Sequence, residues 1–202
     1  MKDLRCAALF GGRGKGQSRR HRQQRVALLC LLAMFATAAA DVKEPDGYWT
    51  GPIDSPVPET ITGGQVIHAQ ALANLIEAHN PVVIDVSNTP KRPDGMALDA
   101  PWLPLPHEAI PGSLWIPEAG MAEVPPHVDE FFREELSEAT DGNLDATVVI
   151  YCHEQCWLSW NAAKRAISYG YRNVHWFPQG IEGWRAAGFK TEVMKPRLPP
   201  QP

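Results

Sequence analysis

Two cysteines in the C-terminal third of the chain are the residues best suited to chemistry. Cys152 follows a β-branched run at residues 147–151, and Cys156 stands four positions later, where a helix is predicted to begin. The carboxyl end of a buried strand and the amino end of the next helix offer unpaired backbone N–H groups and the positive end of the helix dipole. Both favour a thiolate over a thiol, so this segment predicts a reactive sulfur site.

The spacing of the two cysteines leaves several redox states open. Cβ atoms at positions i and i+4 of a regular helix lie about 5–6 Å apart, whereas a disulfide needs about 3.5–4.5 Å. A bond therefore requires Cys152 to lie off the helix. The accessible states are then a dithiol, an internal disulfide, and a persulfide on Cys152 that Cys156 resolves by attacking it. A purely structural disulfide that closes a small loop is the alternative interpretation.

Other sites built on cysteine fit the spacing less well. Attachment of c-type haem needs a histidine directly after the second cysteine, where this chain has Trp157, and a thioredoxin-type motif has two residues between its cysteines rather than three. A metal site needs about four ligands. Cys152, His153, Cys156 and His107 could be imagined together, although nothing in the spacing requires it, and we predict no metal and no other cofactor.

The side chains beside the cysteines have two interpretations each. His153 could protonate a leaving sulfur or steady a thiolate, and it could equally be an exposed loop histidine with no special task. Trp157 and Trp160 could form an aromatic wall for a cofactor or a partner, although tryptophans at the start of a helix more often pack a core.

The elements that must position these residues alternate between helix and strand. A Pro-rich excursion at residues 88–106 interrupts the alternation. The pattern predicts an α/β fold with a mostly parallel central sheet and helices on both faces, and ligands bind such folds at the carboxyl ends of the strands. We expect helices at residues 68–79, 129–136, 158–169 and 181–187, and strands at residues 82–86, 113–116, 147–151 and 173–177.

At this point the residues resemble a known family, the rhodanese-like domains, over residues 61–192. The landmarks follow in order: Asp85 at a strand end, His107-Glu-Ala-Ile-Pro-Gly-Ser, Cys152 after its strand, and Gly180-Ile-Glu-Gly-Trp184. Residues 110–117 and 156–165 are similar to the exported CXXCW-motif proteins associated with pyrroloquinoline-quinone-dependent catabolism, although three residues rather than two separate the cysteines here.

The resemblance implies a three-layer rhodanese-like fold, a periplasmic location, and Cys152 at the position of the family's nucleophile. It also implies that Asp85 accepts hydrogen bonds from the loop backbone, unless it only caps the segment that follows it. A typical sulfurtransferase loop contains glycine and basic residues, which gather N–H groups around an anionic persulfide and attract thiosulfate. Here His153, Glu154 and Gln155 stand between the cysteines, and the charge of Glu154 disfavours thiosulfate.

The first 40 residues predict a secretory signal peptide. They hold eight basic side chains and one acidic, then an apolar run at residues 26–35 and small residues before a cut after Ala40. The apolar segment is about 15 residues where a membrane span needs about 20, so we expect no span after cleavage. Of 19 basic and 23 acidic residues, 11 and 22 would remain, a net charge of −11. Such a charge argues against nucleic acid as a partner.

Together these features predict an exported single-domain protein. We divide it into a signal peptide (1–40), an extended arm (41–60), a rhodanese-like domain (61–192) and a C-terminal tail (193–202). The first functional hypothesis is persulfide chemistry or sulfur transfer at Cys152, with Cys156 as the resolving thiol and a small sulfur compound or a protein thiol as partner. Whether the protein turns over as an enzyme is left open. The alternatives are a non-catalytic accessory protein for a periplasmic pyrroloquinoline-quinone dehydrogenase or cytochrome, and a thiol–disulfide oxidoreductase.

Overall fold

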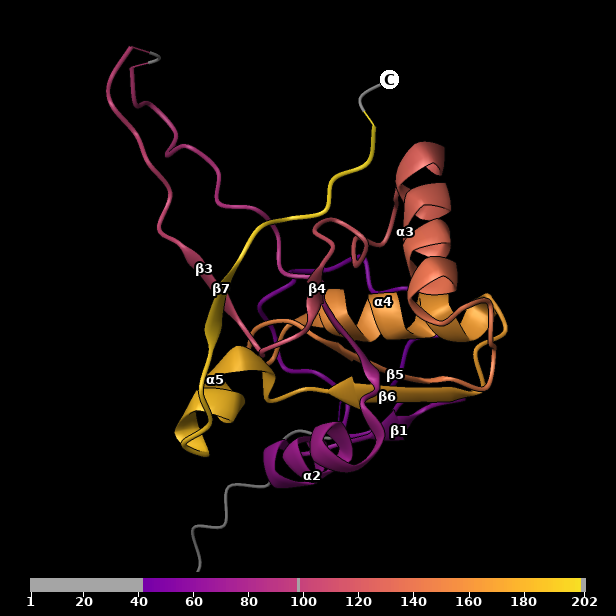
Figure 1. The fold of residues 1–202 in the computed structure, drawn as a ribbon. Helices are drawn as coiled ribbons and strands as arrows, with labels where there is room; N and C mark the ends of the chain where they lie inside the picture. The colour runs from indigo at the N-terminus through magenta and orange to yellow at the C-terminus, as the bar shows by residue number, and fades with distance from the viewer. Residues whose placement is uncertain (1–41, 98, 201–202) are drawn as a thin grey trace, which may run out of the picture. The chain divides into compact units, whose positions relative to one another are not determined.

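The computed structural model describes residues 42–97 and 99–200. The signal-peptide prediction concerns residues that lie outside this range. Among the residues described, no helix is both long and apolar enough to cross a membrane. The elements, shown in Figure 1, are β1 (Gln65–Val66), α2 (Ala69–His79), β2 (Val82–Asp85), β3 (His107–Ala109), β4 (Leu114–Trp115), α3 (Pro126–Ala139), β5 (Thr147–Tyr151), α4 (Trp157–Ser168), β6 (Asn173–Phe177), α5 (Gly180–Ala186) and β7 (Glu192–Met194).

Five of these strands form one parallel sheet in the order β1-β6-β5-β2-β4. β5 is central, and its Val148 lies opposite Val82 of β2 on one side and Val174 of β6 on the other. The β-branched runs of β2 and β5 are buried almost throughout, as expected for strands covered on both faces. The predicted α/β class with a mostly parallel sheet is therefore confirmed.

Each face of the sheet carries a separate hydrophobic cluster. Val148 and Ile150 of β5 point to the cluster that includes residues of α3 and α4. Val149 and Tyr151 point to the opposite cluster, which includes residues of α2 and α5. Because side chains alternate between faces along a strand, Cys152 falls on the α3 and α4 side, and it belongs to that cluster.

The predicted helices and strands exist, and their boundaries shift by a few residues. The largest shift is in α3, which begins at Pro126 rather than at residue 129. Pro126 is the first residue of this helix. Proline is favoured at the first helical position, since its missing N–H would have no partner there, and it initiates this helix.

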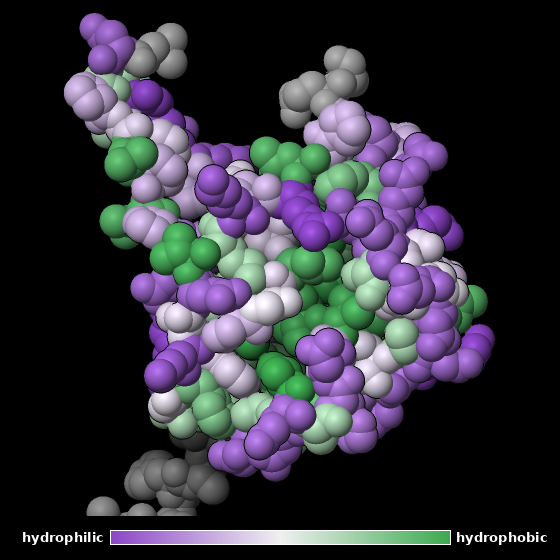
Figure 2. Space-filling model, viewed as in Figure 1, coloured by the Kyte–Doolittle hydropathy of each residue, from purple (hydrophilic) through white to green (hydrophobic). Residues whose placement is uncertain are grey.

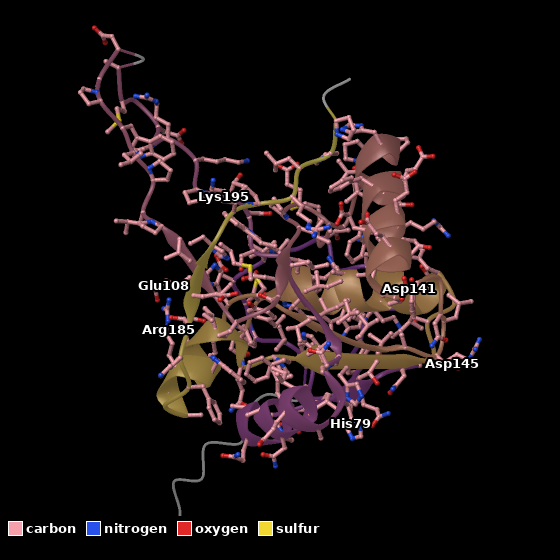
Figure 3. All side chains as sticks on the ribbon, in the orientation of Figure 1. His79, Glu108, Asp141, Asp145, Arg185 and Lys195 are labelled. Atoms are coloured by element: carbon pink, nitrogen blue, oxygen red, sulfur yellow. The ribbon has the colours of Figure 1, made fainter. Side chains whose placement is uncertain are left out.

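A two-stranded antiparallel ribbon, β3 paired with β7, was not predicted. His107 lies opposite Met194, and Ala109 opposite Glu192. The ribbon is tied to α5 by an ion pair between Glu108 and Arg185 at 2.7 Å, and the two side chains lie together in Figure 3. Strands of three residues are too short to show a periodic pattern, which explains why the sequence did not reveal them.

The segment after β7 runs beside the edge strand β4. The backbone N–H of Arg197 donates to the carbonyl oxygen of Trp115 at 2.8 Å, and its guanidinium pairs with Glu135 of α3 at 2.6 Å. Figure 2 shows apolar side chains gathered on the face around β4, with polar side chains surrounding them. The domain's contacts thus continue to residue 197, past the boundary at 192 that the sequence suggested.

The N-terminal arm, described from residue 42, packs along α4. Asn161 exchanges two hydrogen bonds with the backbone of Trp49, at 2.8 and 3.1 Å. The indole N–H of Trp160 donates to the carbonyl oxygen of Thr60 at 3.2 Å. Lys164 reaches the carbonyl oxygen of residue 62. Asn161 and Trp160 therefore hold the arm against α4, and Lys164 holds the residues just after it.

Candidate active site

Cys152 lies immediately after β5 at the carboxyl edge of the sheet, as predicted. Its side chain is fully buried. The hydroxyl of Ser87 donates to its sulfur at 3.5 Å, and its carbonyl oxygen accepts the N–H of Ile181 at 3.0 Å. The loop backbone is thus anchored to the start of α5 while the thiol faces the end of β2.

Cys156 is the N-cap residue of α4, and its sulfur lies 3.1 Å from that of Cys152. Both cysteines are free thiols. Cys152 lies off the helix, which is the condition that disulfide formation requires. Since a disulfide bond is about 2.05 Å long, a movement of about 1 Å would join the sulfurs. The pair can therefore alternate between dithiol and disulfide without rearrangement of the fold.

The pKa values of the two thiols are shifted in opposite directions. The hydrogen bond that Cys152 donates to Cys156 raises the pKa of Cys152 well above its ordinary value, and burial and the nearby Cys156 add to that shift. The same hydrogen bond lowers the pKa of Cys156. The backbone N–H groups of Leu158 and His153 lower it further, against the effects of burial and of Asp54. An anion on this pair is therefore better stabilised on Cys156.

Glu182 of α5 holds the loop between the cysteines. One carboxylate oxygen accepts the backbone N–H of Glu154 at 2.9 Å, and the other lies 3.3 Å from Nδ1 of His153. Burial alone would raise the pKa of Glu182, but the N–H of Glu154, its own N–H and His153 outweigh burial and lower it. The side chain of Glu154 is exposed, so it remains free to act on approaching ions.

Gln155 turns the loop toward helix α4. Its φ of 54° is in the left-handed region, where a residue other than glycine is uncommon. Its N–H donates to the carbonyl oxygen of Pro178 at 3.2 Å, and its side-chain oxygen accepts the N–H of Val57 at 3.2 Å. Gln155 is thus a structural link between the loop, the end of β6 and the arm.

Gly180 makes the close approach between the loop and α5 possible. Its φ is +56°, and a Cβ placed there would lie 2.3 Å from the carbonyl carbon of His153. A side chain at this position would therefore push the loop away from α5. The sequence contained a signal for this contact, because Gly180 and Glu182 belong to the landmarks that resemble the rhodanese-like domains.

Residues 53–57 of the arm, which we call the strap, cross over Cys156. Asp54 forms an antiparallel bridge with Cys156. The carbonyl oxygen of Ile53 accepts the N–H of Trp157 at 2.9 Å. With the strap in this position, Cys156 is only 1 % exposed and Cys152 has no exposed surface. The sequence pattern does not predict the strap, because the strap depends on contacts between residues about 100 positions apart in the chain.

Trp157 anchors the strap rather than lining an open pocket. Its ring stacks on Trp49 at a centroid distance of 4.3 Å with an interplanar angle of 12°. Its indole N–H lies 3.0 Å from the hydroxyl of Ser55 and 3.2 Å from the carbonyl oxygen of Pro56. Trp157 is fully buried, which favours the packing interpretation over an aromatic wall for a ligand.

Asp85 belongs to a buried network beside the pair. One carboxylate oxygen accepts the N–H of Ser87 at 2.8 Å, and the other lies 2.8 Å from Nε2 of His107. His107 stacks on Trp115 at 3.8 Å, and Trp115 donates to the carbonyl oxygen of Ser87 at 2.6 Å. Asp85 thus caps the segment after β2, the second of its two interpretations, and positions Ser87 against Cys152. Ser87 was missed because nothing in its sequence context marks it.

The groups around the thiols are acidic or neutral. Asp54, Asp85, Glu154 and Glu182 lie on the strap, on β2, in the loop and on α5. In the described part of the chain, no cluster of three or more histidine, cysteine or acidic side chains is arranged to hold a metal ion. The imagined set of His107 with the cysteines is therefore not brought together, since Asp85 binds His107 instead.

Comparisons with known proteins agree with this architecture. The family model described as the rhodanese-like domain matches residues 68–187. The comparison with curated proteins gives no match.

Three solved structures are similar at low identity. A thiosulfate sulfurtransferase from Pseudomonas aeruginosa is 18 % identical, over 68 % of this chain and 22 % of that one, with a TM-score of 0.46. A 3-mercaptopyruvate sulfotransferase from Escherichia coli is 20 % identical, over 67 % and 54 %, with a TM-score of 0.45. A polysulfide-sulfur transferase from Wolinella succinogenes is 13 % identical, over 64 % and 79 %, with a TM-score of 0.41. The chain therefore spans only about a fifth of the first of these proteins.

Proposed function

Because the chain belongs to the rhodanese-like domain family, we propose that it carries sulfane sulfur as a persulfide on the Cys152–Cys156 pair. The observation that supports this most directly is the 3.1 Å separation of two free thiols at the mouth between β5 and α4. A thiol that has accepted sulfur there has a second thiol within reach of attack.

The proposed cycle has three steps. A thiolate of the pair attacks the outer sulfur of a persulfide donor, so that a new S–S bond forms on the cysteine and the donor leaves as a thiolate. The second cysteine then attacks the sulfur of the first, the disulfide forms, and the outer sulfur leaves as sulfide with the proton of the second thiol. The two cysteines are oxidised and the carried sulfur is reduced. An external dithiol reduces the disulfide and restores the pair.

The charges around the site support a donor other than thiosulfate. Glu154 is exposed next to the pair, and Asp54 lies over Cys156. Carboxylates at such positions repel a dianion. We therefore propose a small persulfide that carries less negative charge than thiosulfate, such as cysteine persulfide, or a persulfide on a protein thiol, as the sulfur donor.

We further propose that the protein works after export, with residues 1–40 as its leader. In this proposal the protein acts in pyrroloquinoline-quinone-dependent alcohol catabolism in the periplasm, which the resemblance of residues 110–117 and 156–165 to the CXXCW-motif proteins supports. A periplasmic dehydrogenase or cytochrome of that system is then the proposed protein partner.

A second candidate function is that of a non-catalytic accessory protein for such a dehydrogenase. The observation that favours it is that the two thiols have almost no exposed surface, with the strap bridged to Cys156. In that case the pair would hold the arm in place and would not turn over. The third hypothesis, a thiol–disulfide oxidoreductase, shares the dithiol and disulfide states but predicts no sulfur uptake.

Release of sulfide separates these functions. Reduced protein mixed with cysteine persulfide should release about one sulfide per molecule and become the internal disulfide, and an added dithiol should make release continuous. The double variant Cys152→Ser with Cys156→Ser should give only the release seen with donor alone. A folded, fully reduced wild type that releases no more sulfide than this variant would support the accessory function instead.

A further inference from the structure

Ser87 reaches the sulfur of Cys152 from the neighbouring strand. Asp85 at the end of β2 lies opposite Tyr151 at the end of β5. Because the two strands are parallel, the residues that follow them meet at the same edge of the sheet. Ser87 is buried there, and its hydroxyl donates to the sulfur of Cys152 at 3.5 Å. A buried hydroxyl needs a hydrogen-bond partner, and the thiol of Cys152 supplies it.

Hydrogen bonds on both sides of its backbone fix Ser87 in place. Its N–H donates to one carboxylate oxygen of Asp85 at 2.8 Å, and its carbonyl oxygen accepts the indole N–H of Trp115 at 2.6 Å. The other oxygen of Asp85 lies 2.8 Å from Nε2 of His107, which stacks on Trp115. The hydroxyl is therefore held at the sulfur before any reaction begins, and a donor fixed in this way needs little reorganisation when charge develops.

Three backbone N–H groups of the loop have partners other than the sulfur of Cys152. They belong to Glu154, Gln155 and Trp157, and they donate to a carboxylate of α5, to the carbonyl oxygen after β6 and to the strap. A thiolate is stabilised by donors that point at its sulfur. The hydroxyl of Ser87 is a donor that the structure does place there.

The groups that face Cys152 act on its charge in opposite directions. The hydrogen bond to Cys156, burial and the carboxylate of Asp85 raise the pKa of Cys152, and the hydroxyl of Ser87 opposes them. The S–H of Cys152 lies 3.1 Å from the sulfur of Cys156. When the pair holds a single proton and that proton sits on Cys156, the charge is on Cys152. The hydrogen bond from Ser87 is then made to an ionised sulfur, and such bonds are about twice as strong as neutral ones.

We propose that Ser87 is a catalytic residue of the pair, whose hydroxyl stabilises the negative charge on Cys152 as this thiolate attacks the donor. The assignment rests on the proposed function, and Asp85 acts through Ser87 as a positioning residue. Cys152 attacks the outer sulfur of the donor persulfide, a new S–S bond forms, and the donor leaves as a thiolate. Cys156 then attacks the sulfur of Cys152, the disulfide forms, and the outer sulfur leaves as hydrogen sulfide with the proton of Cys156.

The first test measures how alkylation of Cys152 depends on pH in Cys156→Ala, where the second thiol no longer titrates. The plateau rate at high pH reports access to the sulfur, and the midpoint reports formation of the thiolate. Adding Ser87→Ala should move the midpoint to higher pH and slow alkylation about tenfold at neutral pH, because a hydrogen bond to a charged group is lost. A serine with a purely structural role would change the plateau and leave the midpoint in place, and that result would overturn the proposal.

Two further variants in the same background control for packing. Ser87→Thr keeps the hydroxyl and should return the midpoint toward that of Cys156→Ala alone. Ser113→Ala removes a buried hydroxyl that lies 3.2 Å from the hydroxyl of Tyr151 rather than at a thiol, so it should leave the midpoint unchanged. A shift in Ser113→Ala as large as that in Ser87→Ala would assign the effect to a general loss of packing and would overturn the role of Ser87.

The second test follows the sulfur in the same variants. After exposure to cysteine persulfide at neutral pH, Cys156→Ala should accumulate an unresolved one-sulfur adduct on Cys152. With Ser87→Ala added, mass spectrometry should show the adduct forming about tenfold more slowly. Equal rates with and without the hydroxyl would overturn the role of Ser87 in uptake. No adduct in either variant, with a midpoint that does depend on Ser87, would overturn the proposed function but not the effect of Ser87 on the thiolate.

Discussion

At the scale of single residues, the site depends on two small contacts between the loop and α5. Gly180 allows the backbone of residues 152–154 to lie against the start of the helix, and Glu182 binds that backbone. Neither residue touches a thiol. Both fix the loop geometry that brings the two sulfurs to 3.1 Å, and this makes them positioning residues.

A substitution at Gly180 should therefore cost more stability than one at a comparable glycine. Gly188 has a φ of +84° with no atom within 4 Å of a built Cβ, whereas the Cβ of Gly180→Ala would collide with backbone. We expect Gly188→Ala to lower the free energy of unfolding by about 1 kcal/mol through left-handed strain alone. Gly180→Ala should cost about 3 kcal/mol or more, since overpacking adds to that strain. Urea denaturation measures both. Equal costs would mean that the loop does not pack against α5 as described.

The charge of Glu154 gives a second prediction at this scale. Glu154→Arg should raise thiosulfate-dependent sulfur transfer to a thiol acceptor several-fold, because an anion would then be attracted, and added salt should shrink the gain. Glu138→Arg is the matched control. It makes the same charge change at the C-terminal end of α3. That end precedes the start of β5, so it lies at the edge of the sheet opposite to the cysteines. A similar gain in both variants would show that overall charge, rather than the loop, controls access.

At the scale of elements, the main relation is between the arm and α4. Trp157, Trp160 and Asn161 lie on one face of α4 and each binds the arm, and Lys164 on the same face binds residue 62 just after it. Within residues 156–165, one of the two stretches that resemble the CXXCW-motif proteins, three side chains therefore bind the arm. Since the strap is bonded to Cys156 and Trp157, we expect local opening of the arm to control how often reagents reach the thiols.

Weakening the arm should then expose the pair. Trp49→Ala removes the stacking on Trp157, which contributes about 0.5–1.5 kcal/mol beyond burial. Alkylation of the reduced thiols should become roughly tenfold faster, because about 1.4 kcal/mol is a tenfold change in an equilibrium. Trp102→Ala, in the 88–106 excursion, is the control and should leave the rate unchanged. If Trp49→Ala also leaves it unchanged, the strap is not the barrier to reagents.

At the scale of the whole molecule, the covering helices and four of the five strands of the sheet followed from the sequence, whereas the two-residue edge strand β1 did not. Long buried β-branched runs and helices with clear ends predicted β2, β5, β6, α2 and α4 within one or two residues. The ribbon of β3 and β7 and the strap could not be predicted, because both depend on pairings between short segments far apart in the chain. The position of Cys152 followed from the predicted strand before it. The hydrogen-bond partners of the loop N–H groups could not be predicted, because they lie on segments far away in the sequence.

The pair should matter little to the stability of the fold. Closing so small a ring contributes at most about 2 kcal/mol through loop entropy, and the surrounding core is already built from other residues. Oxidised and reduced wild type should therefore unfold within a few degrees of each other in calorimetry. A loss of much more than this on reduction would identify the pair as a structural staple.

Mass spectrometry of the peptide that contains Cys152 and Cys156 tests the central claim most directly. Wild-type protein is exposed to a persulfide donor, and its thiols are trapped at successive times. We expect a species heavier by one sulfur to form first and to convert to the internal disulfide as sulfide appears. Persistence of the unmodified dithiol, in protein whose thiols still react with an alkylating reagent, would contradict persulfide chemistry at this pair.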